Sequence, residues 1–169
     1  MKKEIQDKIN EIEAARQRYR TLIRENGKSL IKVATEGAFE TFPGLRSIQW
    51  AQYTPYFNDG DACTFSVHEC RVQFTEEYWS SLSETEKECF YEYGECFYEY
   101  GDGWEFDDYQ LKQLAATGKG EELRKLSQAI RELDSIKNNL EEMLEETFGN
   151  HVKVIVSRDG IKTKEHRHD

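Results

Sequence analysis

The first forty residues of the chain repeat apolar positions at the spacing of an amphipathic helix. One apolar seam contains Ile5, Ile9, Ile12, Tyr19 and Ile23. With Arg16 counted as a polar member, these positions are alternately four and three residues apart, as on one face of a helix. The pattern resumes after Gly27, which could kink or break the helix. It stops at Pro43, because proline cannot continue the hydrogen-bond ladder. We therefore predict a helical arm over residues 3–42.

A second apolar seam predicts another long helix over residues 119–148. Its members are Leu123, Leu126, Ile130, Leu133, Ile136, Leu140, Met143 and Leu144. Gly149 follows at a position that suits a left-handed helix cap. Each predicted helix has one apolar stripe, which water penalises by roughly 25 cal/mol per Å² exposed. We expect the two helices to pair along their length, with pairing between chains as the alternative, and we expect a homo-oligomer through the helices.

Two segments have the composition of β-hairpins. Residues 45–74 are rich in aromatic and β-branched side chains on both sides of the turn tetrad Asn58-Asp59-Gly60-Asp61. Residues 151–167 form the second candidate, with its turn at Asp159-Gly160. The pattern predicts a single α+β domain over residues 1–169, in which two long amphipathic helices pack on a small antiparallel sheet of two β-hairpins.

Residues 75–118, the acidic insert, separate the first hairpin from the second helix. From Glu76 to Asp108 there are twelve acids, ten aromatic residues and one base, so this stretch carries a charge of −11. The rest of the chain carries about +1, which gives the net charge of −10. Residues 88–94 and 95–101 are an exact tandem repeat of the heptapeptide ECFYEYG. One interpretation is a tolerated expansion of a surface loop. The other is an acidic aromatic surface for a host protein, or a mimic of nucleic acid.

The remaining composition narrows the class of protein. The chain has no apolar run near the roughly 18 residues that span a bilayer, and its N-terminal residues are charged and amphipathic. We expect a cytoplasmic protein without membrane association, with its four cysteines reduced: Cys63, Cys70, Cys89 and Cys96. The acidic balance also argues against ordinary nucleic-acid binding.

The first hairpin carries the strongest candidate for a ligand site. Trp50, Tyr53 and Tyr56 could stack on a planar base, while Arg158 and Lys162 around the second turn could meet phosphates. The polar candidates beside them are Gln52, Asn58, Asp59, Asp61 and His68. Structural roles compete with this interpretation, because Asx residues in turns often bond their own backbone and basic residues protect exposed sheet edges.

Metal binding and catalysis have weaker support. Three imidazoles, those of His68, His166 and His168, could meet across the sheet, but no metal-ligand spacing accompanies them. Cys63 or Cys70 with His68 has the residue types of a nucleophile and its base, yet cysteines in strands are usually small core residues. We expect no enzyme activity and no cofactor.

Two stretches resemble a known family. The runs IQWAQYTPYFNDGD at residues 48–61 and CTFSVH at residues 63–68 look like the hallmark of small uncharacterised proteins of phages and bacteria. FGNHVKV at residues 148–154, RDG at 158–160 and the final HD resemble their C-terminal hairpin. This chain departs from the family pattern at Ala62, where proline is expected, and in its basic tail.

The resemblance implies a phage or prophage setting, in which small non-enzymatic proteins blunt host defence. With the aromatic turn and the basic hairpin, it supports a non-catalytic protein that captures a small nucleotide-like signal such as a cyclic nucleotide. The alternative is an acidic inhibitor or nucleic-acid mimic that acts through residues 76–108. A third possibility, structural assembly through the helices, leaves both features unused.

Overall fold

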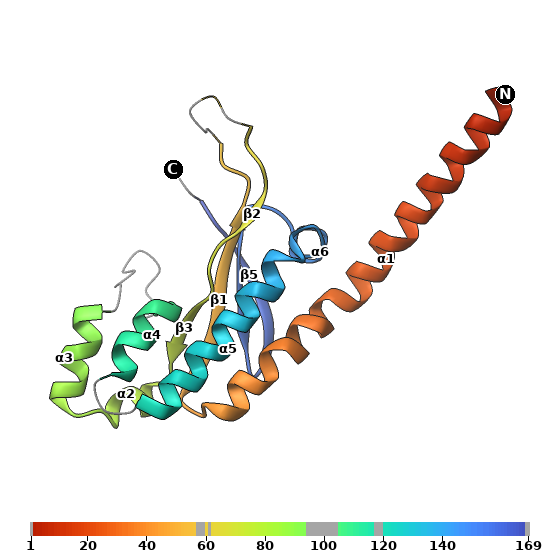
Figure 1. Cartoon of the computed structure of the whole chain (residues 1–169). Coiled ribbons are helices and arrows are strands. Elements are labelled where there is room, and N and C mark those ends of the chain that lie inside the picture. Colours follow the sequence, from red (N-terminus) through yellow and green to blue (C-terminus); the bar gives the residue numbers. More distant parts are fainter. Residues whose placement is uncertain (1, 57–59, 61, 94–104, 117–119, 168–169) are drawn as a thin grey trace.

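A computed structural model describes residues 2–56, 60, 62–93, 105–116 and 120–167. Within them the chain has an α+β fold of six helices and one five-stranded antiparallel sheet (Figure 1). The helices are α1 (Lys2–Thr41), α2 (Glu76–Ser80), α3 (Glu84–Tyr93), α4 (Asp108–Ala115), α5 (Gly120–Asn138) and α6 (Glu141–Phe148). The strands are β1 (Leu45–Tyr53), β2 (Ser66–Val67), β3 (Arg71–Phe74), β4 (Val152–Ser157) and β5 (Gly160–Glu165).

Strand β1 is the centre of the sheet. The strand order is β2-β1-β4-β5, and β3 pairs with β1 on the same edge as β2. The first predicted hairpin is therefore β1 with β2 and β3, and the second is β4 with β5. The pairing of Trp50 with Val154 and of Ile48 with Val156 joins the two hairpins into one sheet. The predicted α+β class is confirmed.

Helices α1, α5 and α6 cover one face of this sheet. Ile48 and Trp50 of β1 point into that layer and are 0% and 1% exposed. The Trp50 indole donates through Nε1 to Gln52 Oε1 at 3.1 Å, so its one polar atom is satisfied inside the core. These alternate residues of β1, with Val154 and Val156 of β4, form the apolar floor on which the helices pack.

Helix α1 is continuous, and Gly27 neither breaks nor ends it. A Cβ atom at Gly27 would lie 2.1 Å from Thr147 Oγ1, so glycine is required for the close approach of α1 to α6. Burial on α1 begins at Ile23 and reaches Phe39. The part of α1 before Ile23 extends away from the rest of the molecule (Figure 1). The expectation that the two predicted helices pair along their whole length is wrong for this N-terminal part.

The second predicted helix is divided into α5 and α6 at Asn139. Tightened turns end α5, because the backbone N–H groups of Asn139 and Leu140 bond carbonyls three residues back, those of Ile136 and Lys137. The division turns α6 so that Met143 and Leu144 are buried. The predicted seam also fails at Ile136, which is 41% exposed, while its neighbour Lys137 is 0% exposed.

The acidic insert contributes to the core instead of forming only a surface loop. Leu82, Phe106, Leu111 and Leu114 are all at most 5% exposed, and Phe106 forms a β-bridge with Val72. The first repeat forms the last part of α3, from residue 88 to the end of the helix at Tyr93. The second repeat lies outside the described residues.

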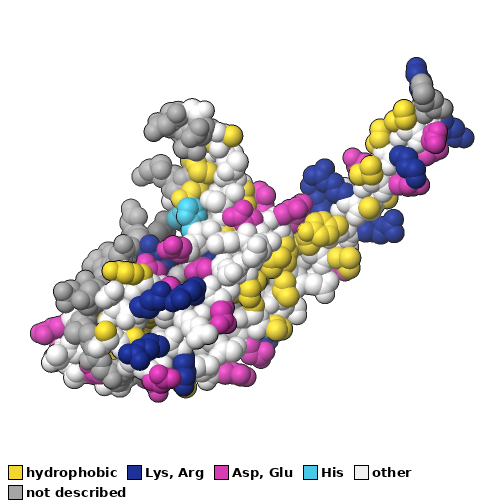
Figure 2. Space-filling view, in the orientation of Figure 1, with side chains coloured by type: hydrophobic (Ala, Val, Ile, Leu, Met, Phe, Trp, Pro, Cys, Tyr) yellow, Lys and Arg dark blue, Asp and Glu magenta, His cyan; other side chains and the backbone are white. Residues whose placement is uncertain are grey.

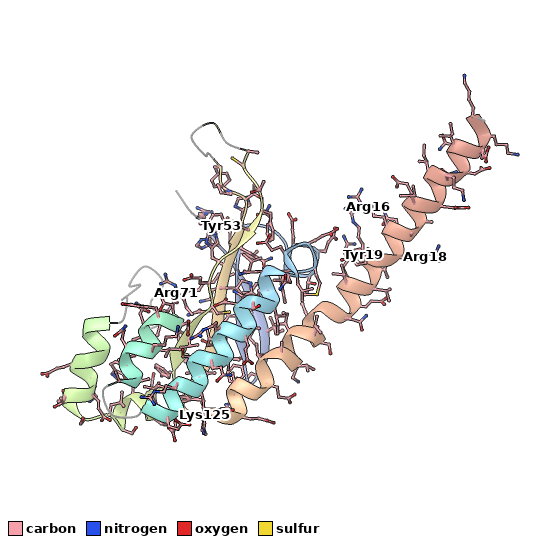
Figure 3. The ribbon with its side chains drawn as sticks, in the orientation of Figure 1. Arg16, Arg18, Tyr19, Tyr53, Arg71 and Lys125 are labelled. Atoms are coloured by element: carbon pink, nitrogen blue, oxygen red, sulfur yellow. The ribbon has the colours of Figure 1, made fainter. Side chains whose placement is uncertain are left out.

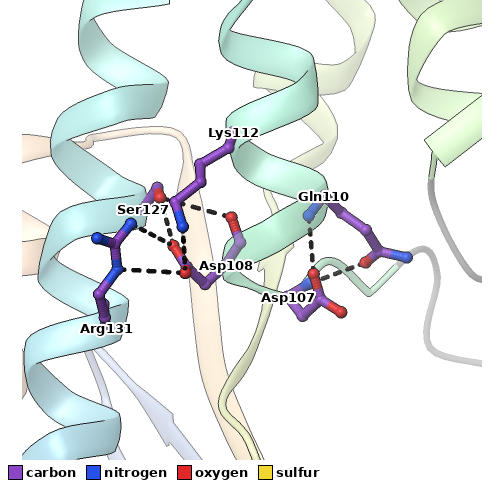
Figure 4. Close-up of polar contacts among 6 residues, drawn as sticks. All are labelled: Asp107, Asp108, Gln110, Lys112, Ser127 and Arg131. Carbon is purple, nitrogen blue, oxygen red and sulfur yellow. Dashed lines mark hydrogen bonds and ion pairs between the residues drawn. The ribbon is translucent and has the colours of Figure 1, made fainter.

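Helix α4 begins with a capping box between Asp107 and Gln110 (Figure 4). Asp108 beside it accepts hydrogen bonds from Ser127 and Arg131 of α5, which ties α4 to α5, and it also pairs with Lys112 of its own helix. Burial alone would raise the pKa of Asp108, but these three donors outweigh it and hold the pKa below its ordinary 3.8.

Candidate functional site

The second face of the sheet is polar and is not covered by α1, α5 or α6. Directly opposed residues of an antiparallel pair share one face, and the register places Gln49 beside Arg71 and Ala51 beside Lys153. Lys153 in turn opposes Lys164 on β5. We call this face, which alternates with the Trp50 side, the open face. Figure 3 shows Tyr53 and Arg71 on the same side of the sheet, away from α6.

Three rings meet at one end of the open face. Tyr53 stacks on His68 with ring centroids 4.3 Å apart and an interplanar angle of 17°. His166 lies against the same tyrosine at 5.3 Å, tilted by 36°. The backbone holds both imidazoles there, because His68 N donates to Ala51 O and His166 N donates to His151 O. The structure thus brings together Tyr53 and His68, which the sequence offered as ligand-binding residues, and His166, which it offered only as a weak metal ligand.

This ring stack forms one wall of a cavity of about 310 Å³. The cations that line it come from three separate strands or their ends: Arg71, Lys153 and Arg167. Its two carboxylates are Glu69 and Glu105. A second hollow of about 630 Å³ shares His68, Glu69 and Arg71 with it and runs toward α4 and α5. The two hollows together make a polar groove beside the 66–71 segment.

Glu105 forms the fixed floor of the cavity. Glu105 is 5% exposed, and its Oε1 accepts hydrogen bonds from Gln49 Nε2 and from Lys153 Nζ, both at 2.6 Å. The Lys153 ammonium thereby neutralises the Glu105 carboxylate at the floor of the cavity. The sequence interpretation missed both residues. Lys153 stands alone in the otherwise apolar strand 152–156, and a half-buried cation needs an anionic partner. That pattern could have indicated a carboxylate such as Glu105 beside this strand.

Lys137 supports the segment that carries His68. Its side chain is fully buried, and Nζ donates to Asp134 Oδ1 at 2.8 Å and to the carbonyl of His68 at 2.6 Å. The same ammonium lies 5.1 Å from the centroid of the Trp50 ring. Asp134 also accepts from the backbone N–H of Cys70 at 2.8 Å. This buried ion pair thereby fastens the 68–70 segment to α5.

Cys70 is not a nucleophile in this arrangement. Cys70 is 0% exposed, and this burial raises the pKa of its thiol to about 12. The nearby Lys137 ammonium lowers that pKa and the Asp134 carboxylate raises it further. The thiol is therefore protonated at neutral pH. The pairing of Cys70 with His68 as nucleophile and base is wrong on this ground. Cys63 is a free, exposed thiol.

Trp50 and Gln52 point to the helix side of β1, which corrects two of the sequence predictions, although Trp50 is among the residues that line the cavity. The Trp50 ring is buried under the helices and offers no face to a ligand. Gln52 is 0% exposed, and its Nε2 donates to the carbonyls of Leu144 and Gly149 at 3.0 and 2.6 Å. Both side chains therefore hold α6 and its C-terminal end on the sheet.

Arg158 also has a structural role instead of the predicted phosphate contact. Its guanidinium donates to the carbonyls of Phe39 at 2.6 Å and of Phe42 and Pro43 at 3.4 Å. The C-terminal carbonyls of a helix carry partial negative charge, so this cation stabilises the end of α1. Lys162 is exposed on β5, opposite Ile155 on the open face and outside the cavity.

The other sequence candidates lie elsewhere. Tyr56 is 70% exposed and stacks on His151 at 4.8 Å and 9°, apart from the cavity lining. Asn58, Asp59, Asp61 and His168 lie outside the described residues. Within the described part of the chain, no group of three or more His, Cys, Asp or Glu side chains is placed to hold a metal ion.

Comparisons with known proteins leave the site to be interpreted from its own geometry. None of the helices that the structure describes is both long and apolar enough to cross a membrane. No protein-family model, no curated protein and no solved structure matches the chain.

Proposed function

We propose that this chain is a non-catalytic binding protein that captures a small, anionic, nucleotide-like ligand on the open face of its sheet. The observation that carries the proposal is the cavity where Tyr53, His68 and His166 meet three cations. Aromatic rings and phosphate donors side by side are what a nucleotide requires, since its base stacks and its phosphate accepts hydrogen bonds.

Charge supports an anionic ligand. The chain as a whole carries −10, yet the cavity lining has three cations against two carboxylates. One of those carboxylates, Glu105, is already neutralised by Lys153. Arg71 and Arg167 present guanidinium groups, whose planar fork matches phosphate oxygens in pairs. A phosphate would therefore find compensating charge here and repulsion at the acidic insert, whose residues 76–108 carry −11.

Size supports a small ligand. A volume of about 310 Å³ lies at the lower end of the roughly 300–1,000 Å³ that small-molecule sites have. One nucleotide unit, such as a cyclic mononucleotide, suits that space. The adjoining hollow of about 630 Å³ is lined by four carboxylates and two arginines, so it would accept an uncharged second sugar or base but would repel a second phosphate.

Capture without conversion would act by sequestration. Of the nucleophile and base pairs considered from the sequence, Cys70 with His68 is disabled by the buried, protonated thiol. A protein of this kind would lower the free concentration of its ligand in proportion to its own abundance. The resemblance to phage proteins suggests a host defence signal as that ligand.

Thermal denaturation with a ligand panel tests this proposal. The panel would hold cyclic mononucleotides, cyclic oligonucleotides, cyclic ADP-ribose variants and inorganic phosphate. Ligand at about 100 times its Kd stabilises the folded state by about 2.7 kcal/mol, which raises Tm by several degrees. The rise should disappear in Arg71→Gln and persist in Lys162→Gln, a matched loss of charge outside the cavity. A flat panel would exclude the proposal, and recovery of altered ligand would show an enzyme instead.

The acidic insert supports a second candidate, an acidic inhibitor of a host protein or a nucleic-acid mimic. The observation in its favour is a gathering of exposed acids on α2 and α3, at Glu76, Glu77 and Glu84, in a stretch of charge −11. Removal of the second repeat unit, residues 95–101, should weaken capture of such a partner and leave the ligand-dependent rise in Tm intact. A loss of both effects would point to misfolding of the insert.

A further inference from the structure

The projecting part of α1 has an apolar stripe that nothing in the described chain covers. In the stripe, Ile5 and Ile12 are 55% and 68% exposed, and Ile9 and Tyr19 are both 47% exposed. Leu22, beside the stripe, is 59% exposed. Figure 2 shows these apolar side chains as a row along the arm. In Figure 3, Arg16 and Tyr19 point to the side of α1 on which α6 lies, and Arg18 points to the other side.

This stripe continues the face by which α1 packs inside the molecule. The 4-3 spacing that starts at Ile5 arrives at Ile23, the first buried residue of α1, and the same face then meets α6 at Gly27. The stripe is thus the outer half of one helix-packing surface. Its repeat of four and three residues is that of a coiled coil, with Arg16 as one polar position that would select register.

A helix of this length gains little stability alone. Most helical stability in proteins comes from packing of an amphipathic face, and no described residue of the chain packs on this one. The 21 residues from Lys2 to Leu22 would extend about 32 Å at 1.5 Å per residue. Such a length matches the contact of a short two-helix coiled coil, in which each stripe covers the other.

We propose that the arm of a second copy of this chain covers the stripe, with the two arms antiparallel. From Ile23 onward α6 occupies the stripe side of α1, so a parallel partner would bring two bodies to the same place. An antiparallel partner places its body at the far end of the arm. Each N-terminal tip then lies beside the α6 of the other copy.

The charges at the first residues of the arm and on α6 are of opposite sign. Lys2 and Lys3 are exposed cations at the tip, and the exposed acids Glu4 and Asp7 follow them along the arm. Helix α6 carries four acids, Glu141, Glu142, Glu145 and Glu146. Within one chain Glu146 pairs with Arg20 at 2.9 Å and with Arg24 at 3.3 Å. Glu142 is exposed at the same end, where an incoming lysine would reach it.

Measurement of mass in solution tests the dimer. Sedimentation equilibrium of the full chain should give twice the 19.9 kDa of one chain. Ile9→Glu with Ile12→Glu should produce a folded monomer whose helical content has fallen. The matched control, Asn10→Glu with Gln17→Glu, adds the same charge off the stripe and should remain a dimer.

Reversal of charge tests the antiparallel order. Lys2→Glu with Lys3→Glu should raise the dimer dissociation constant by about tenfold. Each exposed ion pair contributes little, but two lysines at each of the two ends of the dimer would lose theirs. Addition of Glu142→Lys with Glu145→Lys should restore it. A tip reversal without effect would exclude the antiparallel order. A monomeric wild-type chain would overturn the proposal, and monomers that bind anionic lipid vesicles through the stripe would assign the arm to a membrane surface.

Discussion

The two faces of strand β1 are both largely buried, yet they are stabilised in different ways. On the helix side, Ile48 and Trp50 are buried among apolar neighbours. On the open side, Ser47 and Gln49 are only 3% and 2% exposed, and each bonds a polar partner. Farther along the same face, Tyr53 is half-buried in the ring stack.

The difference shows where this fold can hold a ligand. Apolar burial is non-directional and fills the core around Ile48 and Trp50, so a ligand cannot enter there. The hollow of about 350 Å³ on this side lies at its margin, between α1 and the end of β4. A polar face must satisfy each group with a particular partner, and it leaves a hollow where partners are spaced apart. Stability is therefore concentrated on one side of the strand and recognition on the other.

The largest effect should come from truncation on the helix side. Trp50→Ala should lower the free energy of unfolding by about 3–5 kcal/mol, because it deletes a ring that is 1% exposed. Tyr53→Ala, three residues away on the open face, should cost less than half of that and remove ligand binding. Urea denaturation with ligand titration measures both. Equal losses of stability would erase the distinction between the faces.

The next largest effect should come from the buried cation that connects the two sides. Lys137→Ala removes a fully buried cation from between Asp134 and the His68 carbonyl. The carboxylate left behind is 19% exposed and keeps the Cys70 N–H, so the cost should be about 2–3 kcal/mol, below that of a fully buried pair. Lys125→Ala, with its side chain 59% exposed on the same helix, should change stability by less than about 0.5 kcal/mol. Chemical denaturation of the two variants compares them directly. Equal stability of Lys137→Ala and wild type would show that the pair contributes nothing.

A smaller effect should follow from crowding between the helices that cover the apolar side. Gly27→Ala would force a methyl group against Thr147 and should destabilise by about 1–3 kcal/mol. Gly37→Ala is the matched control on the same helix, since its Cβ would meet no described heavy atom within 4 Å, and it should stabilise by about 0.5–1 kcal/mol. Thermal melts give both signs. A tolerated Gly27→Ala would mean that α1 and α6 separate easily.

The smallest effect should appear as a dependence on pH at the polar contact between α4 and α5. The pKa of Asp108 is lower in the folded state than its ordinary 3.8. Its contribution to stability is therefore complete above that value and is lost as pH falls through the folded pKa. Asp108→Asn should flatten the decline of Tm below about pH 4. An unchanged acid profile in this variant would assign the decline to other carboxylates.

Much of the fold was predictable because it depends on local periodicity. The helix over residues 2–41 and the hairpin of β4 and β5 follow the predicted bounds within one or two residues. The division at Asn139 was not predicted, since Leu140 continues the apolar seam and only packing of α6 on the sheet requires the turn. The burial of Phe106 was missed for a related reason, because acidic neighbours on both sides concealed an apolar residue that pairs with β3.

The candidate site was predictable in part. Alternation along a strand already separates Trp50 from Tyr53, because they differ by an odd number of positions, so the two rings could not stack on one ligand from β1. Tyr53 and His68 were identified from their side-chain chemistry and do lie together. Arg71, Lys153 and Glu105 were missed, because they come from three separate segments and only the sheet register brings them to one cavity.

The sequence by itself determined the 3.6-residue repeat of the helices, the two-residue repeat of the strands and the position of the turn between β4 and β5. These depend on neighbours within a few residues, so they can be read along the chain. Tertiary structure alone decided which face of β1 the helices cover, that Lys137 is buried while Ile136 is exposed, and that the stripe on the arm is open. Those outcomes depend on contacts between residues far apart in the chain, which local periodicity does not encode.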